Sequence, residues 1–285
     1  MMRQLPPELR LDHVRMRVSD LNQALRFYVD RLKFNLLKLS DNQAVLGTSD
    51  QQLLAIEEDK EATRYRTDQH TGLYHMAFLL PSRKDLARFV QHMNIIQHPF
   101  GFADHGVSEA IYLDDPDGNG LEFYRDRPQH LWKTTDGIVE MVNDPIDFHD
   151  LRQELAGSNT AWLNVPTKTT LGHMHLRVGD ITLAENFYKS ILGFDVTWRF
   201  QGALFVSAGG YHHHIGLNTW SSAGATSQPP NALGLVDFTI SLPSETEITH
   251  IKDRLTAVGM DYVAHSQGLT VHDPWQHSIH FNVSD

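Results

Sequence analysis

The sequence predicts an α+β fold built from four βαβββ modules that follow one another in two halves. Two segments, residues 11–34 and 171–194, align without gaps at an offset of 160. Shorter matches tie the second module to the fourth: Leu80-Pro81-Ser82 with Leu242-Pro243-Ser244, and Asp115-Pro116 with Asp273-Pro274. Self-similarity of this kind indicates a duplicated structural unit. The positions of the first segment that are identical in the second are Leu11, His13, Arg17, Val18, Asp20, Ala24, Phe27, Tyr28, Leu32 and Phe34.

The first and third modules are expected to begin with a strand and a helix. Apolar residues alternate with polar ones at Val14, Met16 and Val18, which is typical of a half-buried strand. Asp20 and its repeat Asp180 are favourable N-cap residues, and apolar residues then recur at helical spacing. Alternating strands are expected next, within residues 43–50 and 51–58 of the first module and 202–210 and 213–220 of the third.

The second and fourth modules repeat this order of elements. The second is expected to have a strand within 72–82, a helix near Arg83–Met93 and a last strand at 120–126. The fourth is expected to have a strand within 234–244, a helix near Glu245–Val258 and a last strand at 278–284.

These modules divide the chain into three predicted parts. The first domain covers residues 8–127 (modules one and two), a connector covers 128–168, and the second domain covers 169–285 (modules three and four). Within the connector, residues 144–157 could form a short helix that Gly157 ends. Residues 221–231, rich in Ser, Gly and Pro, are expected to form a loop between modules three and four.

Composition excludes several classes of protein. The chain is 41% hydrophobic and 21% charged, as in a soluble globular protein. It has no apolar run long enough to span a membrane and no apolar core of a secretory signal. A net charge of -11 without a basic cluster disfavours nucleic-acid binding. The absence of cysteine excludes disulfides and thiolate metal sites, and we expect a reducing, cytoplasmic location.

The segment His105–Glu122 is the most informative part of the sequence. It arranges a histidine, Tyr112 and a carboxylate around an Asp-Pro-Asp-Gly turn, whose glycine supplies the backbone freedom that a tight turn needs. The expected order is therefore strand, turn, strand, with Glu122 inside the returning strand, where a metal could use it. The chain also has 18 histidines, and histidine is the commonest metal ligand.

Four βαβββ modules, with His75 on a first strand and Glu122 on a last strand, resemble the vicinal oxygen chelate superfamily of glyoxalases, bleomycin resistance proteins and extradiol dioxygenases. The resemblance implies that modules pair into two curled-sheet domains, each forming a cup. The segment His105–Glu122 is similar to the signature of the type I extradiol dioxygenases, except that Ala103 stands where that family prefers glycine. Among these, the chain most resembles the two-domain bacterial catechol 2,3-dioxygenases.

This resemblance implies a role for particular residues. His75, Glu122 and a histidine from the partner module would hold the metal, and Leu171-Gly172-His173 matches the motif of that second histidine. Tyr112 and His105 would lie near the substrate hydroxyls. The acid–base histidine would come from the run His212-His213-His214. Within that run, alternation puts His212 and His214 on one face and His213 on the other, and His213 and His214 are the better candidates.

The implied chemistry is opening of an aromatic ring next to a diol. Two histidines and one carboxylate leave coordination positions open on a metal such as Fe(II), with Mn(II) as the alternative. The substrates would be O₂ and catechol or a substituted catechol, and binding both at one ion removes much of the entropic cost of bringing them together. A neutral histidine could accept a proton from the catechol. Exposed sheet edges of this fold favour a homodimer.

Several alternatives remain open from the residues alone. Module two could pair with module three and use His173, as we favour, or with module one and use His13. Asp237 and His280 occupy the ligand positions of module four and could form a second triad. Each of these side chains could instead be an ordinary strand, core or loop residue. Other functions are a glyoxalase-like isomerase, a thiol transferase, or a non-catalytic protein that binds an aromatic compound or an antibiotic.

Overall fold

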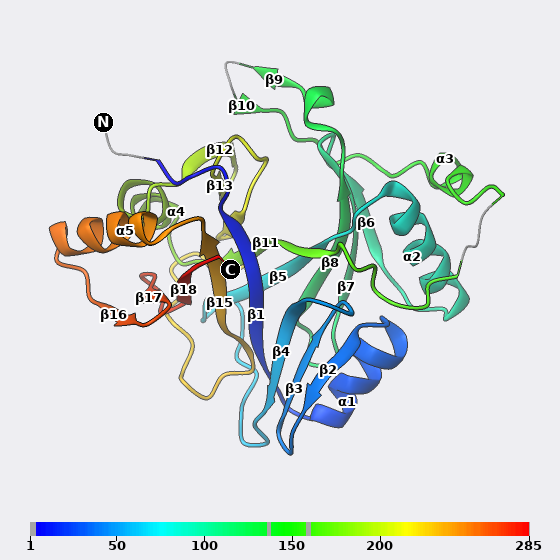
Figure 1. The fold of residues 1–285 in the computed structure, drawn as a ribbon, viewed down its shortest axis with the longest axis horizontal. Helices are drawn as coiled ribbons and strands as arrows, with labels where there is room; N and C mark the ends of the chain where they lie inside the picture. Colours follow the sequence, from blue (N-terminus) through cyan, green and yellow to red (C-terminus); the bar gives the residue numbers. More distant parts are fainter. Residues whose placement is uncertain (1–3, 136–137, 158–160, 285) are drawn as a thin grey trace.

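The computed structural model describes residues 4–135, 138–157 and 161–284. Its elements follow the predicted strand–helix–strand–strand–strand order four times (Figure 1). Modules one and two comprise β1 (Arg10–Val18), α1 (Leu21–Leu25), the π-helix η1 (Arg26–Arg31), β2 (Asn35–Leu39), β3 (Gln43–Gly47), β4 (Gln52–Glu58), β5 (Gly72–Leu79), α2 (Arg83–Ile95), β6 (Gly101–Asp104), β7 (Ser108–Asp114) and β8 (Gly120–Asp126).

The second half of the chain repeats this pattern after a connector. The connector contains η2 (Gln129–Leu131), β9 (Thr134–Thr135), β10 (Ile138–Val139) and α3 (Phe148–Gln153). Modules three and four comprise β11 (Thr170–Arg177), α4 (Ile181–Glu185), the π-helix η3 (Asn186–Ile191), β12 (Asp195–Phe200), β13 (Ala203–Ser207), β14 (Ile215–Asn218), β15 (Gly234–Leu242), α5 (Glu245–Ala257), β16 (Tyr262–His265), β17 (Gly268–His272) and β18 (Ser278–Val283).

Two eight-stranded sheets confirm the predicted α+β class. One has the order β16-β17-β18-β15-β1-β4-β3-β2, and the other β12-β13-β14-β11-β5-β8-β7-β6. Within each module the first and last strands are parallel, and two modules join where their first strands pair antiparallel, at β1/β15 and β5/β11. Modules two and three therefore share one sheet, and modules one and four share the other.

The sheets do not coincide with the two halves of the chain, because each takes one module from each half. This is the exchanged arrangement that the sequence favours. A first domain built from modules one and two alone would need β1 to pair with β5, whereas β1 lies between β15 and β4. The boundaries of the three chain segments, 8–127, 128–168 and 169–285, stay a prediction.

The repeated helices begin at the predicted caps. The Asp20 carboxylate accepts a hydrogen bond from the Gln23 amide (2.8 Å), and Asp180 does the same for Leu183 (2.9 Å). Both helices change from α to π geometry after one turn. The second-module helix α2 and the fourth-module helix α5 lie where predicted, and the connector helix α3 is followed by Gly157 with φ 69°.

Two buried hydrogen bonds connect modules that are consecutive in the sequence. The Tyr28 hydroxyl of module one donates to Asp115 of module two (2.9 Å). Its repeat, Tyr188 of module three, donates to Asp273 of module four (3.1 Å). The matching Asp-Pro turns of the sequence therefore accept hydrogen bonds from the matching tyrosines, so each half is tied together even though its modules belong to different sheets.

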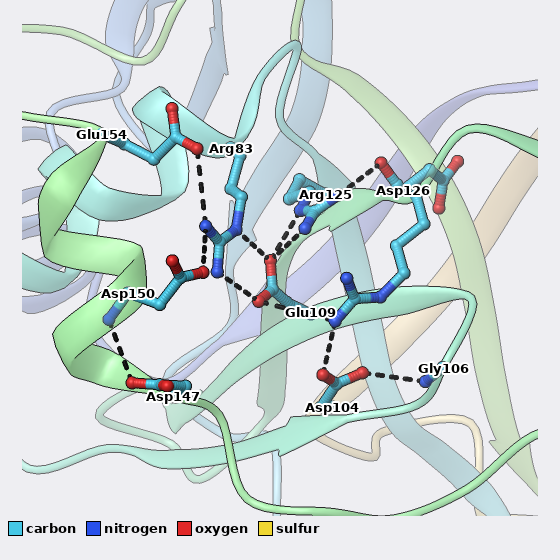
Figure 2. A network of polar contacts seen from close by, with 10 residues as sticks. Arg83, Asp104, Gly106, Glu109, Arg125, Asp126, Asp147, Asp150 and Glu154 are labelled. Atoms are coloured by element: carbon cyan, nitrogen blue, oxygen red, sulfur yellow. Dashed lines mark hydrogen bonds and ion pairs between the residues drawn. The ribbon is translucent and has the colours of Figure 1, made fainter. Parts of the chain in front are cut away.

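A polar network fastens the connector to the sheet that modules two and three form (Figure 2). Glu109 of β7 accepts hydrogen bonds from Arg83 of α2 (2.9 and 3.0 Å) and from Arg125 of β8 (2.7 Å). Arg83 also pairs with Asp150 of α3 (2.8 Å). Beside it, Asp104 of β6 and Asp144 of the connector exchange two backbone hydrogen bonds. The connector is thereby held against the edge of this sheet.

Apolar side chains fill the space on the helix-covered faces of the sheets. Phe34, Phe78, Phe89 and Phe123 are fully or almost fully buried, and the Phe89 and Phe123 rings stack at 4.2 Å. The helix α2 packs on β8, and α5 packs on β17 and β18. Across the described ranges, every helix is too short or too polar to cross a membrane.

Candidate metal centre

Three adjacent strands, β8, β5 and β11, direct polar side chains to one face. Ala77 of β5 is paired with Glu122 of β8 on one side and with His173 of β11 on the other. Residues directly opposite in a sheet share a face, and residues two apart on a strand share it too. His75 therefore points to the same side as Glu122 and His173. The small side chain of Ala77 leaves room between them for all three to converge.

The three donor atoms lie within contact distance of one another. Glu122 Oε2 is 3.0 Å from His75 Nε2 and 3.0 Å from His173 Nε2, and the two nitrogens are 3.3 Å apart. A divalent ion that holds donors about 2.1 Å away and at right angles separates neighbouring donors by about 3.0 Å. The spacing therefore fits one face of an octahedral ion. Among the described residues this is the cluster that could hold a metal ion.

Burial and mutual charge set the protonation of this group. Burial alone would raise the pKa of Glu122, but the His173 and His75 imidazoles outweigh it and hold that pKa well below its usual value. Burial lowers the pKa of His173, although Glu122 partly opposes the effect. A carboxylate beside neutral imidazoles is the form in which such side chains bind metals.

The residue before His173 explains part of the Leu-Gly-His motif. A Cβ on Gly172 would lie 1.9 Å from the Tyr124 hydroxyl oxygen. The pairing of β11 with β5 shifts register between Leu171 and His173, so Gly172 lies in a bulge. A side chain there would push β11 away from β8 and separate His173 from Glu122.

Tyr112 and His105 form a hydrogen-bonded pair beside the triad. Tyr112 is paired with Glu122 across β7 and β8. His105 Nδ1 lies 2.9 Å from the Val142 carbonyl oxygen, to which it donates. Its Nε2 is then an acceptor, and the Tyr112 hydroxyl donates to it (2.7 Å). Burial, reinforced by the Glu122 carboxylate, raises the pKa of Tyr112 well above its usual value.

Of the three consecutive histidines, His213 faces the triad. Its ring centroid is 4.2 Å from that of His173. His212 Nδ1 lies 2.8 Å from His213 Nδ1, and His212 Nε2 lies 2.9 Å from Asp126 Oδ1. A carboxylate at Nε2 favours the tautomer with its proton there, so His212 Nδ1 accepts from His213 Nδ1. This leaves Nε2 of His213 as an acceptor. Burial lowers the pKa of His213 well below its usual value, so the ring is neutral.

His214 points elsewhere, as the alternation within the run predicts. Its Nδ1 accepts a hydrogen bond from the Ala208 amide (3.2 Å), and burial lowers its pKa to about 3. It lines a second cavity together with His13. His13 Nδ1 lies 3.1 Å from Asp12. The structure thus brings His173, and not His13, to His75 and Glu122.

The sheet of modules one and four carries residues at the positions equivalent to the triad, but the acid there is paired with an arginine. His280 Nε2 lies 3.4 Å from Asp237 Oδ2, but His13 does not join them. Instead the Arg15 guanidinium pairs with Asp237 and lies 3.4 Å from Glu57. Arg15 occupies the repeat position of His175. A permanent cation therefore neutralises the acid of this second cup.

The triad opens into a cavity of about 760 Å³. Sequence reasoning did not identify several of its walls. Met141, Val142 and Asn143 of the connector close one side, and their irregular backbone has no periodicity that would have revealed them. The alternation His173, His175, Arg177 along β11 was the available signal for two more wall residues. The remaining aromatic wall residues are Tyr74, Trp198, Phe200, Phe205 and Trp220.

The comparisons with known proteins agree with this geometry. The family model of the glyoxalase/bleomycin resistance protein/dioxygenase superfamily matches residues 10–123 and 170–281. A Bacillus subtilis (strain 168) protein named catechol-2,3-dioxygenase is 38% identical over 275 residues, 94% of each chain.

Solved structures show the same fold at low sequence identity. A candidate dioxygenase from Bacillus subtilis subsp. subtilis strain 168 superposes with a TM-score of 0.63 and 11% identity, covering 99% of this chain and 86% of its own. Glyoxalase I from Zea mays has a TM-score of 0.55 and 14% identity, with 97% and 92% covered. The chain belongs to the glyoxalase/bleomycin resistance protein/dioxygenase superfamily.

Proposed function

We propose that this protein is an extradiol ring-cleaving dioxygenase that acts on catechol or a substituted catechol with O₂. The observation that carries the proposal is the convergence of one carboxylate and two imidazole nitrogens, 3.0–3.3 Å apart, at the buried end of a cavity. The 38% identity to a protein named catechol-2,3-dioxygenase supports it.

His75, Glu122 and His173 would hold the metal, with Fe(II) as the first candidate and Mn(II) as the second. When bound, such an ion supplies open coordination positions for a diol and O₂ and acts as a Lewis acid. Its protein ligands contribute one negative charge, since both imidazoles are neutral donors. The three donors line the cavity, where a flat aromatic substrate would have room between the aromatic walls.

His213 is our candidate for the acid–base histidine. It is neutral and buried, it contacts the ring of His173, and its Nε2 is the nitrogen left to accept a proton. A catechol hydroxyl deprotonates more readily when a base lies within hydrogen-bond reach. His214 faces the other cavity, so we do not assign it this role.

Tyr112 and His105 would orient the diol. Because the Tyr112 proton is directed to His105 Nε2, the lone pairs of the phenolic oxygen are available to accept a hydrogen bond from a substrate hydroxyl. His105 is itself fixed by the Val142 carbonyl. The pair can therefore hold a second hydroxyl group and share the proton that it gives up.

The isomerase and transferase alternatives fit the donor set less well. The superfamily resemblance associates glyoxalase-type centres with two carboxylates, and the triad of the described residues contains one. The structural likeness to maize glyoxalase I is a likeness of fold. A binding protein without a metal would have no need for two imidazoles and a carboxylate at contact distance in a buried place.

The test measures metal content and turnover together. Protein loaded anaerobically with Fe(II) should consume O₂ with catechol and form a yellow semialdehyde. His75→Ala and Glu122→Ala should abolish turnover and metal binding while the circular dichroism spectrum is retained. His173→Ala should lose the metal, whereas His13→Ala, the matched variant from the repeat, should keep it. Normal turnover in His75→Ala or Glu122→Ala would refute the assignment. A cytoplasmic location and a homodimer remain proposals.

A further inference from the structure

One arginine of the cavity wall has no negative partner. Arg177 lies on the same face of β11 as His173 and His175 and lines the cavity. Its Nε is buried and makes no hydrogen bond. Within residues 4–135, 138–157 and 161–284, no carboxylate forms an ion pair with its guanidinium. Arg177 as a whole is half-buried, and a charged group largely removed from water is costly without a partner, so proteins rarely keep one unless something else pairs with it.

The internal repeat provides the matched comparison. Arg17 occupies the equivalent position in module one, at the offset of 160. It is paired across the sheet with Glu57, and its guanidinium lies 3.0 and 2.9 Å from that carboxylate. Arg177 is paired across the sheet with Asn218 instead. The sheet of modules one and four, which lacks the triad, therefore provides a carboxylate for its arginine. The sheet of modules two and three, which has the triad, does not.

Asn218 cannot take the place of the missing carboxylate. Its amide nitrogen lies 3.0 Å from His175 Nε2 and donates to it, and its amide oxygen accepts from the Trp220 backbone (3.3 Å). Both ends of the amide are thus occupied, and both hold cavity-wall residues in place. The guanidinium of Arg177 keeps its hydrogen-bond donors for another acceptor.

Arg177 is positively charged at neutral pH. Burial, with a contribution from the nearby Arg64, lowers its pKa to about 10, which is still above the physiological range. Arg64 donates to the Gly118 carbonyl (2.8 Å), and Gly118 is also a wall residue. Two positive charges therefore lie at this end of the cavity, together with the Asp114 carboxylate, which is close enough to act electrostatically on Tyr74, as Arg177 is, and forms no ion pair with Arg177. A guanidinium binds carboxylates through two parallel hydrogen bonds, which are stronger when the site is dry.

The position along β11 sets the length of the ligand. Arg177 follows His173 by four residues, about 13 Å along a strand. An arginine side chain spans part of this distance, and an aromatic ring with its diol at the metal triad spans another part. The remainder suits a short chain on the ring, on the side away from the two hydroxyls. The centroids of the Tyr74 and Trp220 rings lie 4.8 and 5.6 Å from that of the His175 ring, which stands between His173 and Arg177 on this face, and they form the wall here.

We propose that Arg177 forms an anion subsite of this cup and that the preferred substrate is a catechol with a carboxylate on a short chain. The diol part of this inference rests on the proposed function, whereas the anion subsite does not. It predicts that affinity depends on the carboxylate even when the diol is missing. The two ideas can therefore be tested separately.

The first experiment is calorimetric binding to the metal-free protein. The probes are 3-(4-hydroxyphenyl)propanoate and 4-propylphenol, which have similar length and differ in charge. We expect the wild-type protein to bind the carboxylate about 10- to 100-fold more tightly. In Arg177→Gln the two affinities should become nearly equal. Equal affinities in the wild-type protein would overturn the proposal.

A second variant tests the same idea without removing the arginine. Asn218→Glu places a carboxylate opposite Arg177, as Glu57 stands opposite Arg17, and should also remove the preference for the anion. Arg17→Gln is the matched control and should retain the full preference. Retention of the preference in both Arg177→Gln and Asn218→Glu would overturn the proposal.

Turnover separates the two proposals. With Fe(II) bound, 3-(3,4-dihydroxyphenyl)propanoate should have a kcat/KM about 10- to 100-fold above that of 4-propylcatechol, and Arg177→Gln should abolish the difference mainly through KM. If neither catechol is opened while the calorimetric preference persists, the proposed function fails and the anion subsite stands. If both are opened equally well by the wild-type protein, the subsite fails and the proposed function stands.

Discussion

Glu109→Gln tests whether the polar network of Figure 2 stabilises the protein. Glu109 is 1% exposed and accepts hydrogen bonds from Arg83 and Arg125, whose side chains are 19% and 9% exposed. Removing one member of a buried charge pair costs about 3–5 kcal/mol, and here Arg125 loses its carboxylate partner whereas Arg83 keeps Asp150 and Glu154. Glutamine keeps the shape and one acceptor, so we expect the lower end, about 3 kcal/mol.

Differential scanning calorimetry measures this loss directly. For a chain of 285 residues, the entropy of unfolding near 60 °C is about 0.6 kcal/mol/K, so the Tm should fall by about 5 °C. Glu185→Gln is the matched control: Glu185 pairs with Arg199 and Lys189, whose side chains are 53% and 49% exposed. Such surface pairs contribute less than about 1 kcal/mol. Equal shifts in the two variants would refute the reasoning.

The same carboxylate predicts a pH dependence. Burial would raise the pKa of Glu109, but Arg83 and Arg125 outweigh it and hold the pKa below its usual value. The unfolded chain, with a pKa of about 4.3, then takes up the proton first as the pH falls. The stabilisation is therefore complete above about pH 5 and is lost as the pH falls through the folded-state pKa. The Tm difference between wild type and Glu109→Gln should narrow in acid; a constant difference down to about pH 3 would contradict this.

Three further predictions concern the two cups. Asp126→Asn should lower kcat about 10- to 100-fold at unchanged metal content, because it removes the partner that orients His212 and, through it, His213; unchanged kcat would show that the contact has no such role. Adding Fe(II) at about 100 times its Kd should stabilise the wild type by about 2.7 kcal/mol and His75→Ala by much less, as thermal shifts would measure. Each wild-type chain should bind one equivalent of metal, and His280→Ala should leave this stoichiometry unchanged. If the wild type binds two equivalents and His280→Ala binds one, the second cup also binds a metal ion.

Local patterns in the sequence predicted the parts of the fold that depend on neighbouring residues. Asp20 and Asp180 cap helices because a carboxylate three residues before a free amide can reach it wherever the helix lies in the molecule. The strands carrying His75 and Glu122 were found from alternation and from the turn between β7 and β8. The choice between His13 and His173 could not be settled this way, because pairing of two first strands depends on packing between distant modules.

The residues that the sequence left undecided, and those that it did not reveal, also have physical reasons. His213 and His214 precede β14 and lie outside its regular register, so the sequence could not decide which one faces the triad. Asn218 has no functional signature of its own, and its importance comes from where β14 places it, beside Arg177. The contribution of Met141–Asn143 depends on the connector being held by β6 and α2, which involves residues far apart in the sequence.

The two cups show how one repeated framework can have two uses. In both sheets, parallel and antiparallel pairing brings three strands together and directs an acid and a histidine to the same face: Glu122 with His173 in one, Asp237 with His280 in the other. An acid buried at such a place needs a cation. In the second cup the cation belongs to the chain, since Arg15 reaches Asp237. In the first, the repeat position of Arg15 is His175, whose burial lowers its pKa well below the usual value and leaves it neutral. In the first cup burial acts to raise the pKa of Glu122, but the His173 and His75 imidazoles lower it, and we propose that a bound metal ion supplies the permanent positive charge that Arg15 supplies in the second cup.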